Sequence, residues 1–174
     1  MSFIKFLGTA GARFVMLKQL RASGGIWFSI KETNFLVDPG PCCLLRCLKS
    51  RPKLLPEKLD GIFLSHKHLD HSCDINLMIE GMTEGGFKKR GIVFAPADAI
   101  ENDPVILKYL RDFPEKIEII KEGGKYYLKN LQFEIPIKHI HGVETYGFKL
   151  KCENIPIISY ISDTSFFPEI IEKY

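Results

Sequence analysis

The chain has little of what proteins inserted in membranes or exported from the cell require. No stretch of its 174 residues approaches the roughly 18 uninterrupted apolar residues of a membrane span. The N-terminal residues lack a basic start followed by a long apolar run, so they do not read as a secretory signal. The five cysteines are odd in number and form no CxxC pair, which argues against a disulfide framework or a thiolate metal site. We therefore expect a cytoplasmic protein with no membrane partner.

The sequence also lacks a strong excess of either charge. With 24 basic and 21 acidic residues the net charge is +3, so charge alone does not predict nucleic acid binding, although it leaves such a partner open. The basic clusters at residues 49–53 and 88–90 are typical of solvated loops. The chain has no internal repeat, and its length is that of one domain, which we place over residues 1–174.

Short strand-like runs alternate with helical segments, which predicts a mixed α and β fold with helices covering packed sheets. The expected helices cover residues 44–50, 74–82, 104–112 and 168–174. The Gly123-Gly124 pair predicts a hairpin turn between strands at 116–121 and 125–128. The other expected strands cover residues 3–7, 25–31, 34–37, 61–65, 91–95, 131–140, 146–152 and 157–161.

One short segment carries most of the chemistry. Residues 65–72 read SHKHLDHS, so three of the five histidines and one aspartate lie within six positions, directly after an apolar strand. Residues two apart in an extended chain point the same way, so His66 and His68 can bind one ion. A bend toward the next helix turns Asp70 and His71 to a neighbouring position. Imidazole and carboxylate are ligands of zinc, and two ions a few ångström apart would share a nucleophilic hydroxide.

With this HxHxDH motif the sequence resembles the metallo-β-lactamase superfamily, and the match continues along the chain. Further matching features are GTAG at 8–11, LVDPG at 36–40, His141 and Asp163. The resemblance implies a four-layer αβ/βα sandwich with the active site at one edge of the sheets. It also implies two zinc ions, with manganese or iron as alternatives. Its implied site residues are His66, His68 and His141 for one ion, Asp70, His71 and Asp163 for the other, and Asp70 also as the catalytic residue.

The roles of three site residues each have an alternative. His139 lies two residues before His141 on the same expected strand face, so it competes as a ligand or orients the site from behind. Asp163 could instead cap the last helix. Asp38 matches an acid that supports the superfamily's site, but it could be a plain turn residue.

One feature departs from the superfamily pattern. The resemblance implies a further histidine beyond Asp163, yet no histidine follows position 141, and the chain ends eleven residues after Asp163. We expect that the chain lacks its last C-terminal elements and is a piece of a longer domain. The alternative is an incomplete second metal site.

The reaction is predicted to be hydrolysis by a metal-bound hydroxide of a phosphodiester or nucleic-acid-like substrate. Residues 141–147, HGVETYG, resemble the RNase Z branch of the superfamily, but only 21 residues separate His141 from Asp163, too few for the tRNA-gripping insertion of that branch. One alternative is a hydrolase of a small ester, thioester, lactone or cyclic phosphate. Another is a non-catalytic metal-binding or interaction module. The expected partner is a small-molecule or phosphodiester substrate, and a homodimer stays open.

Overall fold

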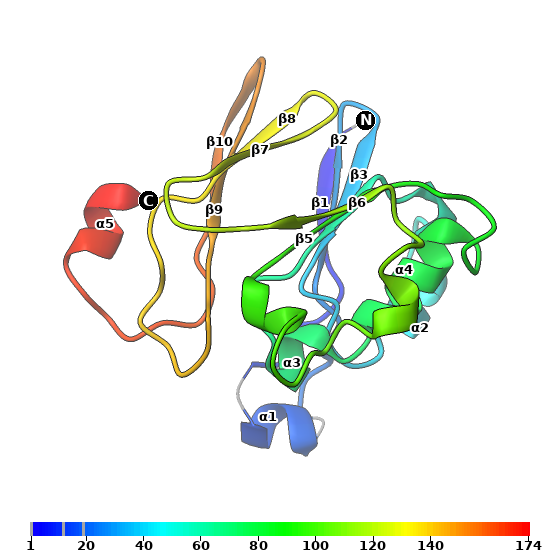
Figure 1. The fold of residues 1–174 in the computed structure, drawn as a ribbon, viewed down its shortest axis with the longest axis horizontal. Helices are drawn as coiled ribbons and strands as arrows, with labels where there is room; N and C mark the ends of the chain where they lie inside the picture. The colour runs from blue at the N-terminus through cyan, green and yellow to red at the C-terminus, as the bar shows by residue number, and fades with distance from the viewer. Residues whose placement is uncertain (1, 12, 19) are drawn as a thin grey trace.

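The protein is described by a computed structural model that covers residues 2–11, 13–18 and 20–174, and two sheets form its centre (Figure 1). Sheet A has the order β1-β2-β3-β4-β5-β6 and sheet B the order β10-β9-β8-β7. The strands are β1 (Phe3–Phe6), β2 (Ile26–Ile30), β3 (Thr33–Val37), β4 (Gly61–Phe63), β5 (Ile92–Ala95), β6 (Lys116–Ile119), β7 (Lys125–Leu128), β8 (Leu131–Glu134), β9 (Phe148–Cys152) and β10 (Ile155–Tyr160).

The helices are short and lie outside the sheets (Figure 1). They are α1 (Arg13–Leu17), α2 (Cys43–Lys49), α3 (Leu69–Ser72), α4 (Ile75–Thr83) and α5 (Glu169–Lys173), with single 3-10 turns at Pro56–Lys58, Ala97–Ala99 and Lys108–Leu110. Helices α2 and α4 cover the outer face of sheet A, and α5 lies on the outer side of sheet B (Figure 1). Two inner sheets and two outer helical layers thus confirm the expected four-layer αβ/βα sandwich.

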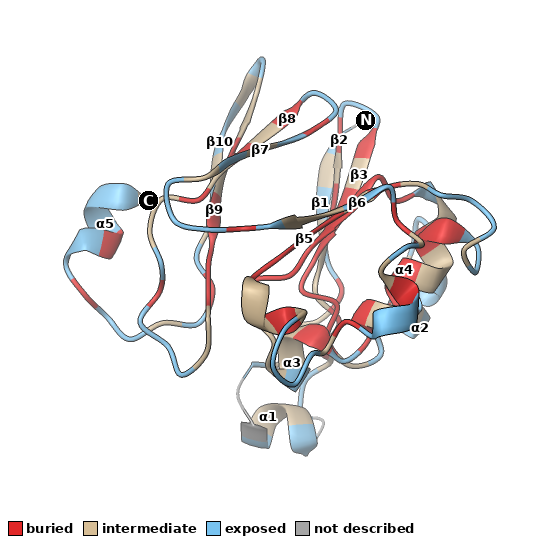
Figure 2. Cartoon of the chain, in the orientation of Figure 1, coloured by how far each residue is buried: buried red, intermediate tan, exposed pale blue. Residues whose placement is uncertain are grey.

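Strand residues of sheet A alternate between two apolar cores. Leu36 of β3 packs in the core that includes Met78 of α4. Its neighbour Phe35 packs between the sheets, where its ring centroid lies 4.5 Å from that of Phe28 and 5.1 Å from that of Phe133. Because successive side chains of a strand point to opposite faces, the inner strands β2 to β5 each contribute to both cores. Figure 2 shows this burial along the strands of sheet A and the inner side of α4.

The direction of the strands determines where polar groups gather. The β3–β4 and β4–β5 pairs are parallel, so the carboxyl ends of these strands lie at one edge of sheet A. Asp38 follows β3 at that edge, and Ser65 and His66 follow β4. Asp38 has a φ of 49°, a left-handed conformation that aspartate tolerates better than most residues. Crevices at this edge of an open α/β sheet are the usual place for ligands.

The expected hairpin around Gly123-Gly124 is wrong. Strand β6 pairs with β5 in sheet A, whereas β7 pairs with β8 in sheet B, so the glycine turn carries the chain from one sheet to the other. The backbone explains the change of partner, because the Gly123 N–H donates to the Ile135 carbonyl and the Ile135 N–H donates to the Gly124 carbonyl. Ile135, which makes these contacts, comes directly after β8. The strand therefore ends at Glu134, earlier than the expected strand 131–140.

The expected helix at 104–112 is also wrong, since only the 3-10 turn Lys108–Leu110 forms there. The guanidinium of Arg111 donates to the carbonyls of Ile100 and Ile106 at 2.7 and 3.0 Å. The Ile106 carbonyl would otherwise accept the Leu110 N–H of an α-helix, which instead donates to Leu107. The expected helices near α2, α4 and α5 are confirmed within two residues.

The hydropathy expectation agrees with the fold. Over the part of the chain that the structure describes, no helix has both the length and the apolar character needed to cross a bilayer.

Candidate metal centre

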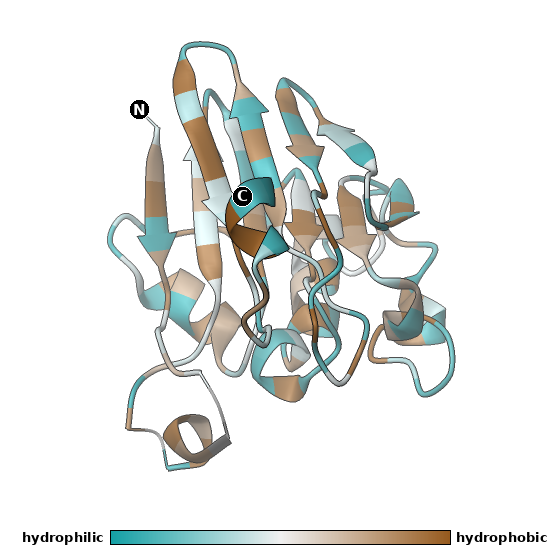
Figure 3. Ribbon diagram, turned by 90° about the vertical axis from the view of Figure 1, so that its left-hand side faces the viewer, coloured by the Kyte–Doolittle hydropathy of each residue, from teal (hydrophilic) through white to brown (hydrophobic). Residues whose placement is uncertain are grey.

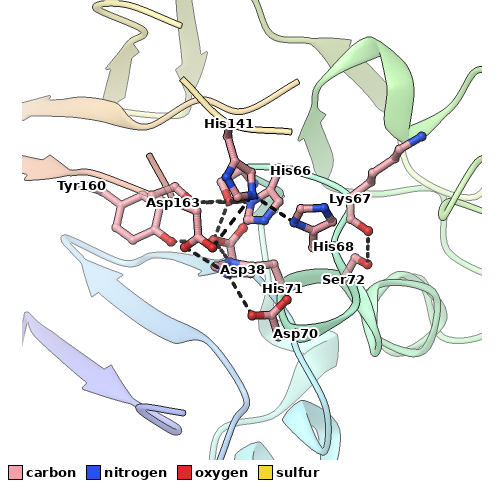
Figure 4. Close-up of polar contacts among 12 residues, drawn as sticks. Asp38, His66, Lys67, His68, Asp70, His71, Ser72, His141, Tyr160 and Asp163 are labelled. Carbon is pink, nitrogen blue, oxygen red and sulfur yellow. Dashed lines mark hydrogen bonds and ion pairs between the residues drawn. The ribbon is translucent and has the colours of Figure 1, made fainter. Parts of the chain in front are cut away.

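The motif histidines meet His141 and Asp163 where the two sheets end side by side (Figure 4). His66 follows β4, His68 precedes α3, and Asp70 and His71 lie within α3. His141 belongs to the connection between β8 and β9, and Asp163 follows β10. Residues separated by up to 97 positions are thereby brought together.

The potential ligand atoms form two groups that share one histidine. His66, His68 and His141 make up the first group, and His66, His71 and Asp163 the second; within each group the ligand atoms lie within 4.8 Å of one another. The Nε2 of His141 is 3.0 Å from the Nδ1 of His68. The grouping of His66 with His68 is the one expected from their spacing.

Asp70 lies beside these groups and belongs to neither. Its Oδ2 is 3.7 Å from the Nε2 of His71, and its side chain is 16% exposed. The carboxylate lines a cavity of about 590 Å³ together with His68, His141 and Asp163. It is therefore open to a molecule in that cavity.

The geometry separates His141 from its rival. His139 is 3% exposed, its Nε2 lies 3.1 Å from the Tyr174 hydroxyl, and it belongs to neither group. Asp163 is not the cap of α5, because the residue at that position is Pro168. The Oδ1 of Asp163 instead lies 3.5 Å from the Nε2 of His71.

Asp38 is built into the site and is not a plain turn residue. It is 5% exposed and accepts hydrogen bonds from the Ser65 N–H and Oγ, both at 2.7 Å, and from the Tyr160 hydroxyl at 2.5 Å. The Nδ1 of His71 lies 2.9 Å from its Oδ2. Burial raises the pKa of the Asp38 carboxyl, but His71 and these donors outweigh burial and lower it. Asp38 therefore fixes the ring of His71 with Nε2 toward Asp163.

Tyr160, Ser65 and Ser162 had no sequence signal. The Ser162 hydroxyl donates to the Ser65 Oγ at 2.7 Å, and the Ser65 hydroxyl donates to Asp38. Ser65 has no further proton to donate, so the Nδ1 of His66, 3.0 Å away, must be the donor of that pair. The hydroxyl network thus leaves the Nε2 of His66 as a bare lone pair.

The Nε2 of His66 indicates whether the site fits a metal ion. This atom is buried and has no hydrogen-bond partner among the described residues, which is costly for a polar atom unless a ligand engages it. Burial, and secondarily the neighbouring His71, lowers the pKa of His66 to about 3, so the ring is neutral at neutral pH. A neutral imidazole is the form that binds zinc. The first group therefore fits a divalent cation.

Charge in the second group supports the same fit. Burial lowers the pKa of His71, but the carboxylates of Asp38 and Asp163 outweigh it and raise the pKa to about 10. The hydrogen bond to His71 is the main reason that the pKa of Asp163 falls to about 2. Two carboxylates thus hold one proton on His71, a place where the chain stabilises positive charge. A cation bound by His71 and Asp163 would replace that proton.

Replacing Tyr160 by phenylalanine should weaken metal binding through Asp38. The variant keeps the ring, which packs 5.3 Å from Phe148, and removes one donor from the Asp38 carboxylate. We expect metal affinity to fall about 10- to 100-fold, as for the loss of an outer partner of a ligand. The measurement is a competition titration with a chromogenic chelator.

Tyr126→Phe is the matched control, because the Tyr126 hydroxyl bonds only to the backbone at Ile119 and Lys121 among the contacts described. It should change the melting temperature without changing metal affinity. Equal metal affinity of Y160F and the wild-type protein would show that Tyr160 supports the fold alone.

Comparison with known proteins gives the same family that the motifs indicate. A profile of the beta-lactamase superfamily domain matches residues 33–174. An uncharacterised protein of Methanocaldococcus jannaschii is 30% identical over an alignment of 176 positions that covers 98% of this chain and 65% of that protein. The ribonuclease Z of Enterococcus faecalis is 26% identical over an alignment of 155 positions that covers 85% of this chain and 48% of that enzyme. The chain spans about half to two thirds of the length of these relatives.

Solved structures share the fold. The metallo-beta-lactamase fold protein YhfI from Bacillus subtilis superposes with a TM-score of 0.70 at 24% identity, over 87% of this chain and 59% of that one. The short form of human tRNase Z superposes with a TM-score of 0.67 at 16% identity, over 94% of this chain and 69% of that one. Together with the profile match over most of the chain, these likenesses show that the protein belongs to the metallo-β-lactamase superfamily, most of whose members are hydrolases.

Proposed function

We propose that the protein is a metal-dependent hydrolase of phosphodiesters that uses a dinuclear zinc centre. The observation that carries the proposal is the pair of ligand groups that share His66, whose buried Nε2 has no hydrogen-bond partner among the described residues. The names of two similar proteins favour a phosphate ester or anhydride as the bond that is cleaved. One relative is named a ribonuclease, and one protein of similar structure is named a diphosphatase. Both names describe cleavage of phosphate esters or anhydrides.

The residues have separate tasks. His66, His68 and His141 would hold one ion, and His71 and Asp163 with Asp70 the other. When bound, such ions acidify water and stabilise the negative charge that develops on a phosphoryl oxygen. Asp38 keeps the His71 ring in place, and the Ser65–Ser162 pair keeps the Nε2 of His66 free of protons.

Asp70 is the residue that accepts the proton of the attacking water. Its carboxylate faces the cavity and has no hydrogen-bond donor among the contacts described, so it is free to accept one from the attacking water. Asp70 orients that water and takes its proton as the oxygen bonds to phosphorus.

The experiment compares two substrates under metal control. Protein stripped with a chelator should hydrolyse neither bis(p-nitrophenyl) phosphate nor an acyl thioester, and zinc or manganese should restore cleavage of the phosphodiester. Preferential thioester cleavage would instead identify a small-ester hydrolase. Full zinc binding with no turnover of either substrate would indicate a metal-binding module.

A further inference from the structure

The cavity beside the histidine cluster has two chemically different walls. One side consists of candidate metal ligands and Asp70, as described above. The other side consists of Phe14, Met16 and Leu69. A volume of about 590 Å³ is in the range of small-molecule sites, which combine apolar walls with a few polar groups. A substrate whose phosphorus lies at the metal ligands has room in this cavity to place one of its ester groups against the apolar wall.

The apolar wall is exposed although it is built from large side chains. Phe14 is 73% exposed and Leu69 is 65% exposed. Helix α1, which carries Phe14 and Met16, projects from the fold below α3 in Figure 1, and Figure 3 shows its hydrophobic colouring away from the body of the protein. Single exposed apolar residues are common, but several along a cavity next to polar site residues mark a ligand surface.

One residue of the apolar wall is a direct neighbour of two site residues in the sequence. Leu69 begins α3 and lies between His68 and Asp70. Its side chain therefore keeps a fixed relation to a candidate ligand and to the proposed base. An ester group held against Leu69 and Phe14 is held relative to the reacting phosphorus.

The apolar wall offers no cation to a substrate group. No lysine or arginine is among the described residues that line the cavity. The motif lysine, Lys67, points away in Figure 4, with its Nζ 3.3 Å from the Asn102 carbonyl and 4.0 Å from Asp98 Oδ2. A second phosphate would meet no cation there, whereas a flat uncharged ring would meet the phenyl face of Phe14.

We propose that Phe14, with Met16 and Leu69, binds an uncharged aromatic group of the substrate, namely the base of a nucleoside ester. The enzyme would then prefer nucleoside phosphodiesters over simple alkyl phosphodiesters. The proposal rests on the proposed phosphodiesterase function and adds the substrate class. Stacking of a base on an aromatic side chain contributes about 1–3 kcal/mol, so a preference of about fivefold or more is expected.

The test uses two esters with the same leaving group, p-nitrophenyl thymidine 5′-phosphate and methyl p-nitrophenyl phosphate. In both, a water oxygen bonds to phosphorus, the bond to the p-nitrophenolate oxygen breaks, and a phosphomonoester remains. In the wild-type protein the kcat/KM ratio should favour the thymidine ester about fivefold or more, and Phe14→Ala should bring the ratio close to one. Phe87→Ala, which removes a ring that is 93% exposed elsewhere on the surface, should leave the ratio unchanged.

A binding measurement supplies a second readout. Phe14→Trp places an indole in the wall, and thymidine 5′-monophosphate should quench its fluorescence while leaving Phe87→Trp unaffected. The native Trp27 is 2% exposed and gives the same background in both variants.

The outcomes separate the two proposals. Turnover of both esters with a ratio that F14A does not change would overturn the role of Phe14 and leave the hydrolase proposal intact. Absence of turnover of either ester, with quenching in F14W, would overturn the hydrolase proposal and support the aromatic surface. Absence of quenching in F14W would overturn the aromatic surface.

Discussion

His141→Ala should weaken the binding of one metal ion per chain by more than about 100-fold, the upper end of the loss caused by removing an outer partner of a ligand. The reason is that His141 is one of three imidazoles in the first group, and its Nε2 lies 3.0 Å from His68. Two remaining nitrogens leave the ion with open positions that water fills. Elemental analysis after dialysis against a weak chelator measures the loss.

His139→Gln is the matched control for that experiment. His139 is two residues away, but it faces Tyr174 and belongs to neither ligand group. Glutamine keeps a polar group in a buried position, so the variant should retain its metal even where its melting temperature falls. Loss of metal in H139Q and retention in H141A would reverse the assignment of the ligand.

Asp70→Asn should lower kcat for phosphodiester hydrolysis by about 10²- to 10⁴-fold, the contribution of a positioned proton acceptor. An amide cannot take the proton of the attacking water, although it nearly matches the carboxylate in shape. The fold should persist, because among the contacts of the described residues the carboxylate makes only an ion pair with His71, at 3.7 Å. Metal should stay bound at His66, His68 and His141. The measurements are steady-state kinetics, metal content and thermal melting.

Asp112→Asn removes an exposed carboxylate remote from the motif and should change none of these quantities. Near-normal turnover of D70N would show that another group accepts the proton. Loss of metal from the first group in D70N would show that Asp70 supports the site as a whole and that its effect is not specific to proton transfer.

The motif predicted most of the site because its information is local. His66 and His68 lie on one strand-to-helix connection, so their spacing predicts that they point the same way, and the bend into α3 turns His71 to a neighbouring position. His141 and Asp163 came from resemblance to the superfamily, and the structure brings both beside the motif. No local pattern could have supplied them, since their position depends on how sheet B packs against sheet A.

Other parts of the site depend on contacts that a sequence does not show. Tyr160 reaches Asp38 across 122 positions, and Ser162 reaches Ser65 across 97. Phe14 could be recognised as a candidate only after the fold had placed α1 beside α3. Apolar residues of that kind read as core in a sequence, and only their exposure distinguishes them.

The two wrong predictions about the fold also arose from contacts that the sequence does not show. Gly123-Gly124 allows a tight turn, but the turn does not determine which strands pair, and here β6 and β7 enter different sheets. At 104–112 the predicted helix does not form, because the Arg111 guanidinium donates a hydrogen bond to the Ile106 carbonyl that a helical N–H would otherwise use. By contrast, the apolar run at 61–65 predicted a buried strand, and Ile62 and Phe63 of β4 are buried in the two different cores.

Anomalous diffraction at the zinc edge from crystals grown with zinc is the most direct test of the proposed centre. One peak should be surrounded by His66, His68 and His141 and a second should lie beside His71 and Asp163, with the Nε2 of His66 facing the metal. Well-ordered imidazoles with no anomalous peak among them, or zinc found only elsewhere on the chain, would contradict the proposed centre and the hydrolytic function that depends on it.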